Sequence, residues 1–150
     1  MARLETKKEK EVKRALELFK QKKSKSCRLY LHNTIAKTKD AELIGYFAKE
    51  IINEDESLHY FEPAIADNKY TPAYILAELA LSKDPITRTY VAFNLNTPKN
   101  SIYILSKDEC EFVRIVAKKN PNLPDKRFFP TLSTAINIFI NFLKCLLGLN

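Results

Sequence analysis

The chain of 150 residues contains only two glycines and no tryptophan. A β-sandwich or β-barrel needs many glycine-rich turns, so this scarcity argues against both architectures. It also excludes a glycine-rich phosphate-binding loop. Alanine, leucine, isoleucine, lysine and glutamate are plentiful instead, and 45% of the residues are hydrophobic, which is enough to bury a core. The composition therefore predicts an all-α fold.

Cysteines and histidines are few and scattered. Cys27, Cys110 and Cys145 are far apart and show no metal-ligand spacing, so we expect free thiols in a reducing compartment, the cytoplasm. His32 and His59 belong to no ligand motif and are expected to be packing residues. The sequence thus predicts no metal, no cofactor and no catalytic group.

Long apolar runs are absent as well. No stretch reaches the roughly 20 apolar residues that a membrane span needs, and the charged start of the chain is not followed by the apolar segment of a secretory signal. We therefore expect a soluble protein.

Positive charge is present, and it is concentrated at one end. The formal net charge is +7, and residues 1–28 hold 11 Lys or Arg against 4 Asp or Glu, whereas residues 29–150 hold 14 of each kind. Residues 1–28 are predicted to form a basic N-terminal helix and cap. Such a charged end is either a solvated helix surface or a site for nucleic acid or another polyanion.

Two residue types recur at a constant spacing of 26 residues. Asparagine occupies positions 68, 94 and 120, and proline occupies positions 72, 98 and 124. A threonine precedes Pro72 and Pro98, so we expect Thr71 and Thr97 to be N-caps and each proline to stand at the first position of a helix. Each asparagine then marks the corner between two repeated units.

Each repeated unit is predicted to contain two short helices. The first begins near the proline and buries Leu76 and Leu79, or Ile102 and Leu105 one unit later. The second is opened by Asp84-Pro85, with Asp108-Glu109 expected to serve similarly in the next unit. Its expected core residues are Tyr90 and Val91, then Val116 and Ala117.

The segment before the clear repeats resembles a degenerate copy. Residues 35–48 are similar to residues 65–80 with two residues deleted, and Asp40 is expected to cap the helix that follows it. About four units result, with an array over 29–128 and clear repeats over 58–128. Because one unit cannot bury its own apolar face, such units stack, and the terminal ones are atypical.

Residues 129–150 leave the repeat pattern. They predict a separate helix with only Asn137, Asn141 and Lys144 as a narrow polar stripe, and a helix this apolar is normally buried. It is expected to cap the array, to form a homodimer interface through Ser133–Leu147, or to dock in a groove.

The segments "TRTYVAFNLNTP" and "VRIVAKKNPNLP" resemble the leucine-rich repeat variant family, which is related in shape to HEAT-type repeats. The spacing here is longer than that family's usual unit. The resemblance implies a right-handed α-solenoid of about four stacked two-helix repeats with atypical N- and C-terminal capping helices, the second helix of each unit having 3₁₀ character. It also implies that Arg88 and Arg114 pair with an acidic turn residue, namely Asp84, Asp108 or Glu111. The iron–sulfur module of some members has no counterpart here, because only Cys27 lies near that end.

A helical repeat array favours protein–protein interaction through a concave face built from the second helices. The alternative is binding of a DNA or RNA backbone, for which the candidate residues are Lys20, Lys22, Lys23, Lys25, Arg28, Arg88, Arg114, Lys118 and Lys119. An enzyme similar to HEAT-like DNA glycosylases is disfavoured, because those proteins are longer and use tryptophan in their aromatic cradles.

Overall fold

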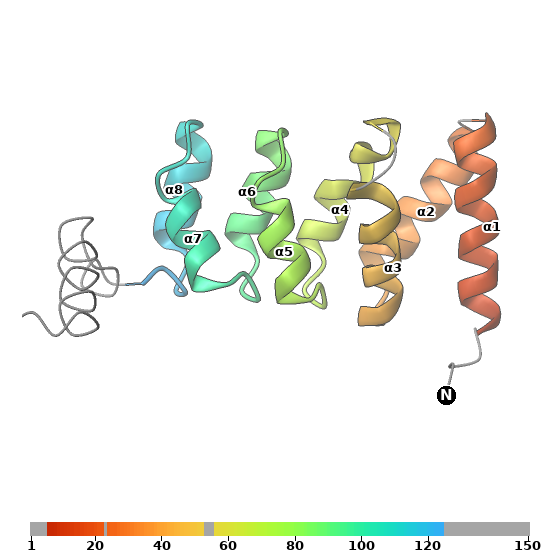
Figure 1. Ribbon diagram of the computed structural model, residues 1–150, viewed down its shortest axis with the longest axis horizontal. Helices are drawn as coiled ribbons and strands as arrows, with labels where there is room; N and C mark the ends of the chain where they lie inside the picture. The colour runs from red at the N-terminus through yellow and green to blue at the C-terminus, as the bar shows by residue number, and fades with distance from the viewer. Residues whose placement is uncertain (1–5, 23, 53–55, 125–150) are drawn as a thin grey trace, which may run out of the picture.

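The computed structural model describes residues 6–22, 24–52 and 56–124, and within these ranges it contains helices and turns but no strand (Figure 1). The elements are α1 (Lys7–Lys22), α2 (Lys25–Lys37), α3 (Ala41–Ile52), the 3₁₀ helix η1 (Glu56–Phe61), α4 (Glu62–Asp67), α5 (Ala73–Leu79), α6 (Pro85–Phe93), α7 (Lys99–Leu105) and α8 (Glu111–Lys119). The predicted all-α class is confirmed. The predicted C-terminal helix, with its dimer segment Ser133–Leu147, lies outside the described residues.

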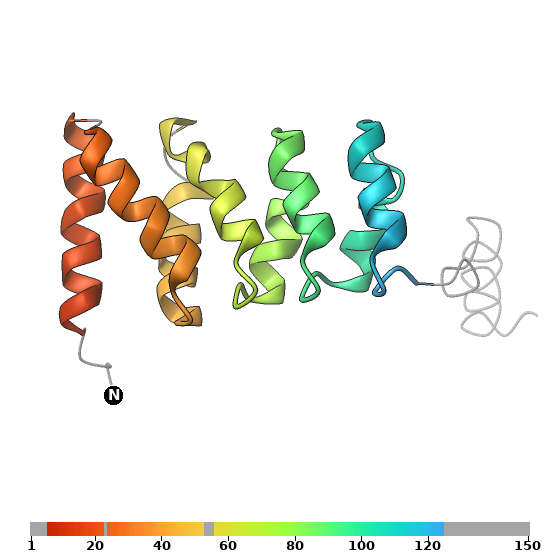
Figure 2. The ribbon, with the colours of Figure 1, turned by 180° about the vertical axis from the view of Figure 1, so that it is seen from behind.

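The helices form a row two layers deep. Figure 1 looks onto α1, α3, α5 and α7, which we call the first helices, and Figure 2 looks from behind onto α2, α4, α6 and α8, the second helices. Each first helix packs against the second helix that follows it, and the second helices also pack in succession, α2 on α4, α4 on α6 and α6 on α8. The second helices α6 and α8 are α-helical, so the expected 3₁₀ character is confined to η1 within the described ranges.

The helices α5 and α7 begin where the prolines predict, but threonine does not cap them. Pro72 and Pro98 themselves stand at the N-cap, with ψ angles of 145° and 146°. The hydroxyl groups of Thr71 and Thr97 point backwards, and each donates a 2.6 Å hydrogen bond to a carbonyl of the preceding helix. The N-cap prediction for these threonines was therefore wrong, because each lies one residue too early in the chain.

Aspartate caps two helices as expected and fails to cap a third. Asp84 accepts hydrogen bonds from the amides of Ile86 and Thr87, and Asp40 caps α3 in the same way. At α8 the N-cap residue is Cys110, which makes no side-chain cap. The prediction that Asp108-Glu109 opens α8 was wrong, because the 26-residue spacing aligns Cys110 with Asp84 and aligns Asp108 with Ser82.

The core lies between the two layers. The expected apolar positions of the repeats are buried, at 0–6% exposure, and they are Leu76, Leu79, Ile102, Leu105 and Val116. Val91 and Ala117 are buried too. Apolar residues that recur at helical spacing on α1 and α3 also face the core: Val12, Leu16 and Phe19 on α1, and Leu43, Ile44, Phe47, Ala48 and Ile51 on α3. Burial thus follows the spacing that the sequence predicts.

Candidate functional site: the face of the second helices

Three buried asparagines fix each second helix to the one before it. The side-chain amide of Asn94 donates to the carbonyls of Ala66 (2.8 Å) and Asn68 (3.0 Å), and Asn120 makes the same pair of bonds one step later. Each Oδ1 accepts from the backbone amide two residues on. Because these groups are buried, the bonds hold neighbouring helices in a fixed register.

The same contact extends to the beginning of the chain. The amide of Asn68 donates to the carbonyls of Ile35 (2.7 Å) and Thr38 (2.9 Å), at the end of α2. The carbonyl of Thr38 thus accepts from Asn68 as the carbonyl of Asn68 accepts from Asn94. Thr38 and Asn68 are 30 residues apart, whereas Asn68 and Asn94 are 26 apart. Thr38, Asn68, Asn94 and Asn120 thus mark equivalent ends of α2, α4, α6 and α8, although the second acceptor on α2, Ile35, lies one residue earlier than its counterpart Ala66 on α4.

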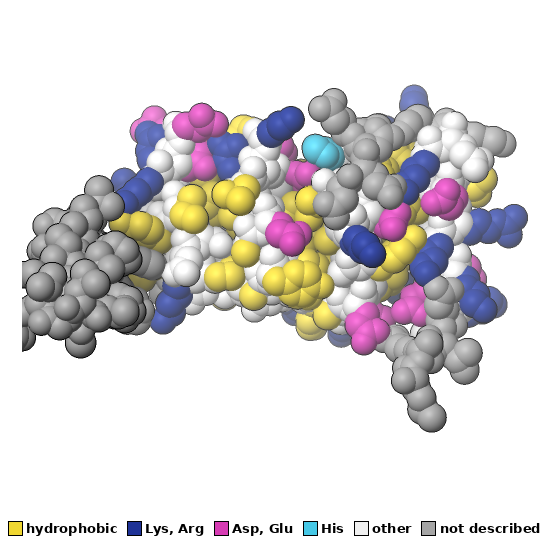
Figure 3. All heavy atoms as spheres, in the orientation of Figure 1, with side chains coloured by type: hydrophobic (Ala, Val, Ile, Leu, Met, Phe, Trp, Pro, Cys, Tyr) yellow, Lys and Arg dark blue, Asp and Glu magenta, His cyan; other side chains and the backbone are white. Residues whose placement is uncertain are grey.

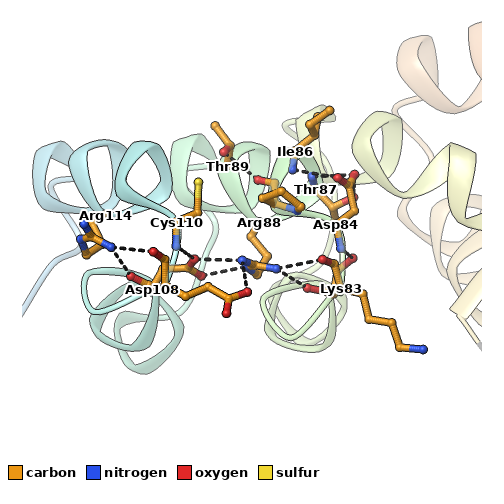
Figure 4. Close-up of polar contacts among 12 residues, drawn as sticks. Lys83, Asp84, Ile86, Thr87, Arg88, Thr89, Asp108, Cys110 and Arg114 are labelled. Carbon is orange, nitrogen blue, oxygen red and sulfur yellow. Dashed lines mark hydrogen bonds and ion pairs between the residues drawn. The ribbon is translucent and has the colours of Figure 1, made fainter.

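A second polar link joins α6 to the turn before α8 (Figure 4). Arg88 donates from Nε and Nη2 to the two carboxylate oxygens of Asp108, at 2.8 and 2.9 Å. Its Nη1 donates to the carbonyls of Ser82 and Lys83, and Nη2 also contacts Glu109 at 3.2 Å. Asp108 is thus the acidic partner of Arg88. The guanidinium is left with no spare donor.

The ion pair shifts the titration of its carboxylate. Burial raises the pKa of Asp108, but the hydrogen bonds from Arg88 and from the Cys110 amide outweigh it, so the pKa lies below its ordinary value. In return, the hydrogen bond to Asp108 raises the pKa of Arg88. Arg88 is 7% exposed, so this candidate for phosphate binding is a structural residue instead. Arg114 repeats one part of the contact, since its Nη1 donates to the carbonyls of Asp108 and Glu109.

The remaining cationic candidates are not gathered in one place. Lys20 forms an ion pair with Glu50 at 2.9 Å. Lys25 and Arg28 are exposed on α2, and Lys118 and Lys119 are exposed on α8. These two helices lie at opposite ends of the row, with α4 and α6 between them (Figure 2). Lys23 and the side chain of Lys22 are not among the described parts.

An exposed row of large apolar side chains runs over α2, η1, α6 and α8. It consists of one residue per helix pair, and we call it the apolar row: Tyr30, Tyr60, Ile86 and Phe112. The spacings along the chain are 30, 26 and 26 residues, as they are for Thr38 and the three asparagines. Their exposed fractions are 40%, 54%, 59% and 59%. A repeated apolar position that stays exposed is not explained by core packing.

Helix α6, in the middle of this face, exposes no charge. On α6 the exposed large side chains are Ile86, Tyr90 and Phe93, and the helix's one charged residue is the buried Arg88. Tyr90, expected in the core, is 36% exposed and forms part of the surface. The opposite face, seen in Figure 3, intersperses hydrophobic side chains with charged ones of both signs.

A groove of about 350 Å³ lies between α6 and α8 on this side. Its lining residues are Pro85, Ile86, Thr89, Tyr90, Phe93, Cys110 and Phe112. At the other end of the row, Tyr30 borders an apolar hollow of about 390 Å³ between α1 and α2. Concave, apolar hollows of this size are typical of binding sites.

The two histidines lie near aromatic or acidic neighbours without forming a catalytic set. The His32 ring is 6.2 Å from that of Tyr60, and His59 Nδ1 is 3.6 Å from Glu62 Oε1. Among the described ranges there is no cluster of three or more potential metal ligands, and none of the helices there is long and apolar enough to cross a membrane.

Comparison with family models, with curated proteins and with solved structures gave no match for this chain. Sequence reasoning missed the apolar row, although its signal was present. Tyr60, Ile86 and Phe112 share the 26-residue spacing of the asparagines. What the sequence did not reveal is that this column faces solvent, since apolar residues at repeat spacing usually indicate the core.

Proposed function

We propose that the chain is a non-catalytic binding module: a right-handed α-solenoid of about four two-helix units that binds another protein through the concave face of its second helices. Support for stacked units comes from the asparagine contacts: Asn94 and Asn120 have equivalent acceptors, and Asn68 makes a similar pair of bonds to the end of α2. The second helices pack on one another more extensively than the first helices do, as expected of the inner layer of a curved stack. The free thiols of Cys27 and Cys110 favour a reducing compartment such as the cytoplasm.

The exposed surface of α6 carries the proposal. A helix in the middle of the row presents Ile86, Tyr90 and Phe93 to solvent without one exposed charge. Exposed apolar patches bordered by polar residues mark interaction sites, and tyrosine and phenylalanine are enriched in the buried cores of interfaces. Protein binding therefore accounts for a feature that folding does not require.

The test compares one substitution on each face. Ile86→Glu puts a charge into the proposed interface, and Ile104→Glu makes the same change on α7, where the residue is similarly exposed (53% against 59%). Proteins retained by the immobilised wild-type chain should be retained by the Ile104 variant and lost by the Ile86 variant. Both variants should unfold within about 0.5 kcal/mol of wild type, because exposed positions tolerate substitution. Equal retention by the two variants would refute the proposal.

Nucleic-acid backbone binding is the second candidate, favoured by the concentration of net positive charge in residues 1–28. It predicts retention of DNA and RNA of any sequence at about 50 mM salt, with a steep loss as salt rises. Reversing the charges of Lys25 and Arg28 should then weaken binding more than reversing Lys118 and Lys119. Absence of a gel shift at low salt would remove this candidate.

A further inference from the structure

We propose that the partner presents an acidic amphipathic α-helix, which lies along the apolar row with an apolar side chain at every seventh position and acidic side chains near both of its ends. This inference rests on the proposed function and specifies the chemistry of the partner.

The spacing of the apolar row selects the periodicity of the ligand. The row offers one large side chain on each of α2, α6 and α8 and a fourth, Tyr60, on η1, which runs directly into α4; axes of packed helices lie about 8–10 Å apart. Seven residues of an α-helix rise about 10.5 Å and complete nearly two turns, so every seventh side chain returns to the same face at a matching distance. In a β-strand, residues three positions apart are separated by a similar distance, but their side chains point to opposite faces of the strand.

One contact joins α2 to Tyr60, and one groove joins two members of the row. Arg28 of α2 lies over the ring of Tyr60, 5.0 Å from its centroid. Ile86 and Phe112 line the same groove between α6 and α8. From Tyr30 to Phe112 the row covers three helix-to-helix steps, or about 24–30 Å, which is the length of a helix of about 16–20 residues.

The charges on this face select acidic ends for the ligand. Exposed cations occur on the two outer second helices: Lys25, Arg28 and Lys37 on α2, and Lys118 and Lys119 on α8. Exposed anions on the second helices are Asp67 and Glu111. On the inner helices α4 and α6, Asp67 is the one exposed charge. A ligand with an apolar middle and carboxylates toward both ends complements this pattern.

The same distribution disfavours a nucleic acid as occupant. A single strand stacked on the aromatic residues would carry a phosphate at every nucleotide and would need cations along the whole groove. Here Arg28 lies beside Tyr60, but α4 and α6 expose no cation, since Arg88 is buried in its bonds to Asp108. An oligonucleotide is therefore an outcome for the experiment to exclude.

The experiment measures binding of the full chain to synthetic 21-residue peptides by fluorescence anisotropy. The reference peptide has leucine at every seventh position, alanine and glutamine elsewhere, and glutamate near both ends. Three control peptides change one property each: lysine in place of the terminal glutamates, leucine at every sixth position, or a central proline that breaks the helix. A single-stranded oligonucleotide serves as competitor.

We expect the reference peptide to bind with a micromolar Kd, and each control peptide to bind at least tenfold more weakly. Ile86→Glu should abolish binding and Ile104→Glu should preserve it. Charge reversal of Lys118 and Lys119 should weaken binding of the reference peptide and strengthen binding of the lysine-ended peptide. The inference is overturned if no peptide binds below about 1 mM, if the lysine-ended or proline peptide binds as well as the reference, or if the oligonucleotide displaces it.

The two proposals fail in different ways. If the Ile86 variant loses the natural partners of the chain while the acidic peptide does not bind, the proposed function stands and the partner chemistry is wrong. If the Ile86 variant keeps those partners, the proposed function itself is wrong.

Discussion

Replacing Asn94 with alanine tests whether the asparagine contacts hold the stack together. Asn94 is 8% exposed, and its side chain makes three hydrogen bonds: two donated by Nδ2, at 2.8 and 3.0 Å, and one accepted by Oδ1 from Asn96 at 2.9 Å. The substitution leaves the carbonyls of Ala66 and Asn68 without this donor. A net contribution of about 1 kcal/mol for each bond gives a loss of about 3 kcal/mol in the free energy of unfolding.

The assay is urea unfolding followed by circular dichroism, with Asn100→Ala as the matched control, because Asn100 is exposed on α7. We expect the control to stay within about 0.5 kcal/mol of wild type. Asn94→Asp keeps the acceptor oxygen but places a second oxygen opposite the two carbonyls. It should therefore be at least as destabilising as Asn94→Ala near neutral pH. Protonation of the aspartate in acid should recover part of this loss. If the free energy of unfolding of Asn94→Ala also stayed within about 0.5 kcal/mol of wild type, the asparagine contacts would not stabilise the stack, and the reasoning would fail.

Three further measurements test the core, the ion pair and a close approach. Leu79→Ala should lower the free energy of unfolding by about 2–5 kcal/mol in the same urea assay, because Leu79 is 2% exposed and its removal leaves a cavity; a loss below about 0.5 kcal/mol would contradict its place in the core. Because the folded-state pKa of Asp108 is lowered, its ionised form stabilises the fold above the ordinary aspartate pKa, and this stability is lost as pH falls through the lowered value. Asp108→Asn should therefore be less stable near pH 7 and should lose less stability on acidification than wild type, as measured by thermal unfolding across pH; parallel pH profiles would contradict it. Gly45→Ala should raise the free energy of unfolding by about 0.5–1 kcal/mol, because alanine favours the helix more than glycine does. The added Cβ meets only the hydroxyl of Tyr74, 2.9 Å away, and this exposed side chain can rotate away. Destabilisation would mean that Tyr74 is held in place.

Local chemistry allowed the sequence alone to predict most of the helical pattern. Proline restricts its own backbone and cannot continue a preceding helix, so Pro72 and Pro98 set the starts of α5 and α7. Aspartate capping involves amides only two or three residues away, which is why Asp40 and Asp84 were predicted correctly. Apolar residues at helical spacing likewise predicted the burial of Leu76 and Leu79 on α5 and of Ile102 and Leu105 on α7.

Predictions that depended on the next helix were decided by the tertiary structure. Asp108 resembles a helix cap in sequence, but Arg88 lies 20 residues before it and binds both of its carboxylate oxygens. Asn94 looked like a turn residue, yet its amide reaches carbonyls 26 and 28 residues earlier. Spacing in the sequence shows that such positions are equivalent, but not which distant group each one meets.

Exposure of the apolar row was the last property that needed the fold. Ile86 and Val91 are both apolar and both repeat in the next unit, as Phe112 and Ala117. Val91 and Ala117 point between the layers and are fully buried, while Ile86 and Phe112 are 59% exposed. The difference arises because a helix packed on one side and at its flanks leaves a strip uncovered, and the angle at which α4, α6 and α8 pack decides which residues lie on that strip.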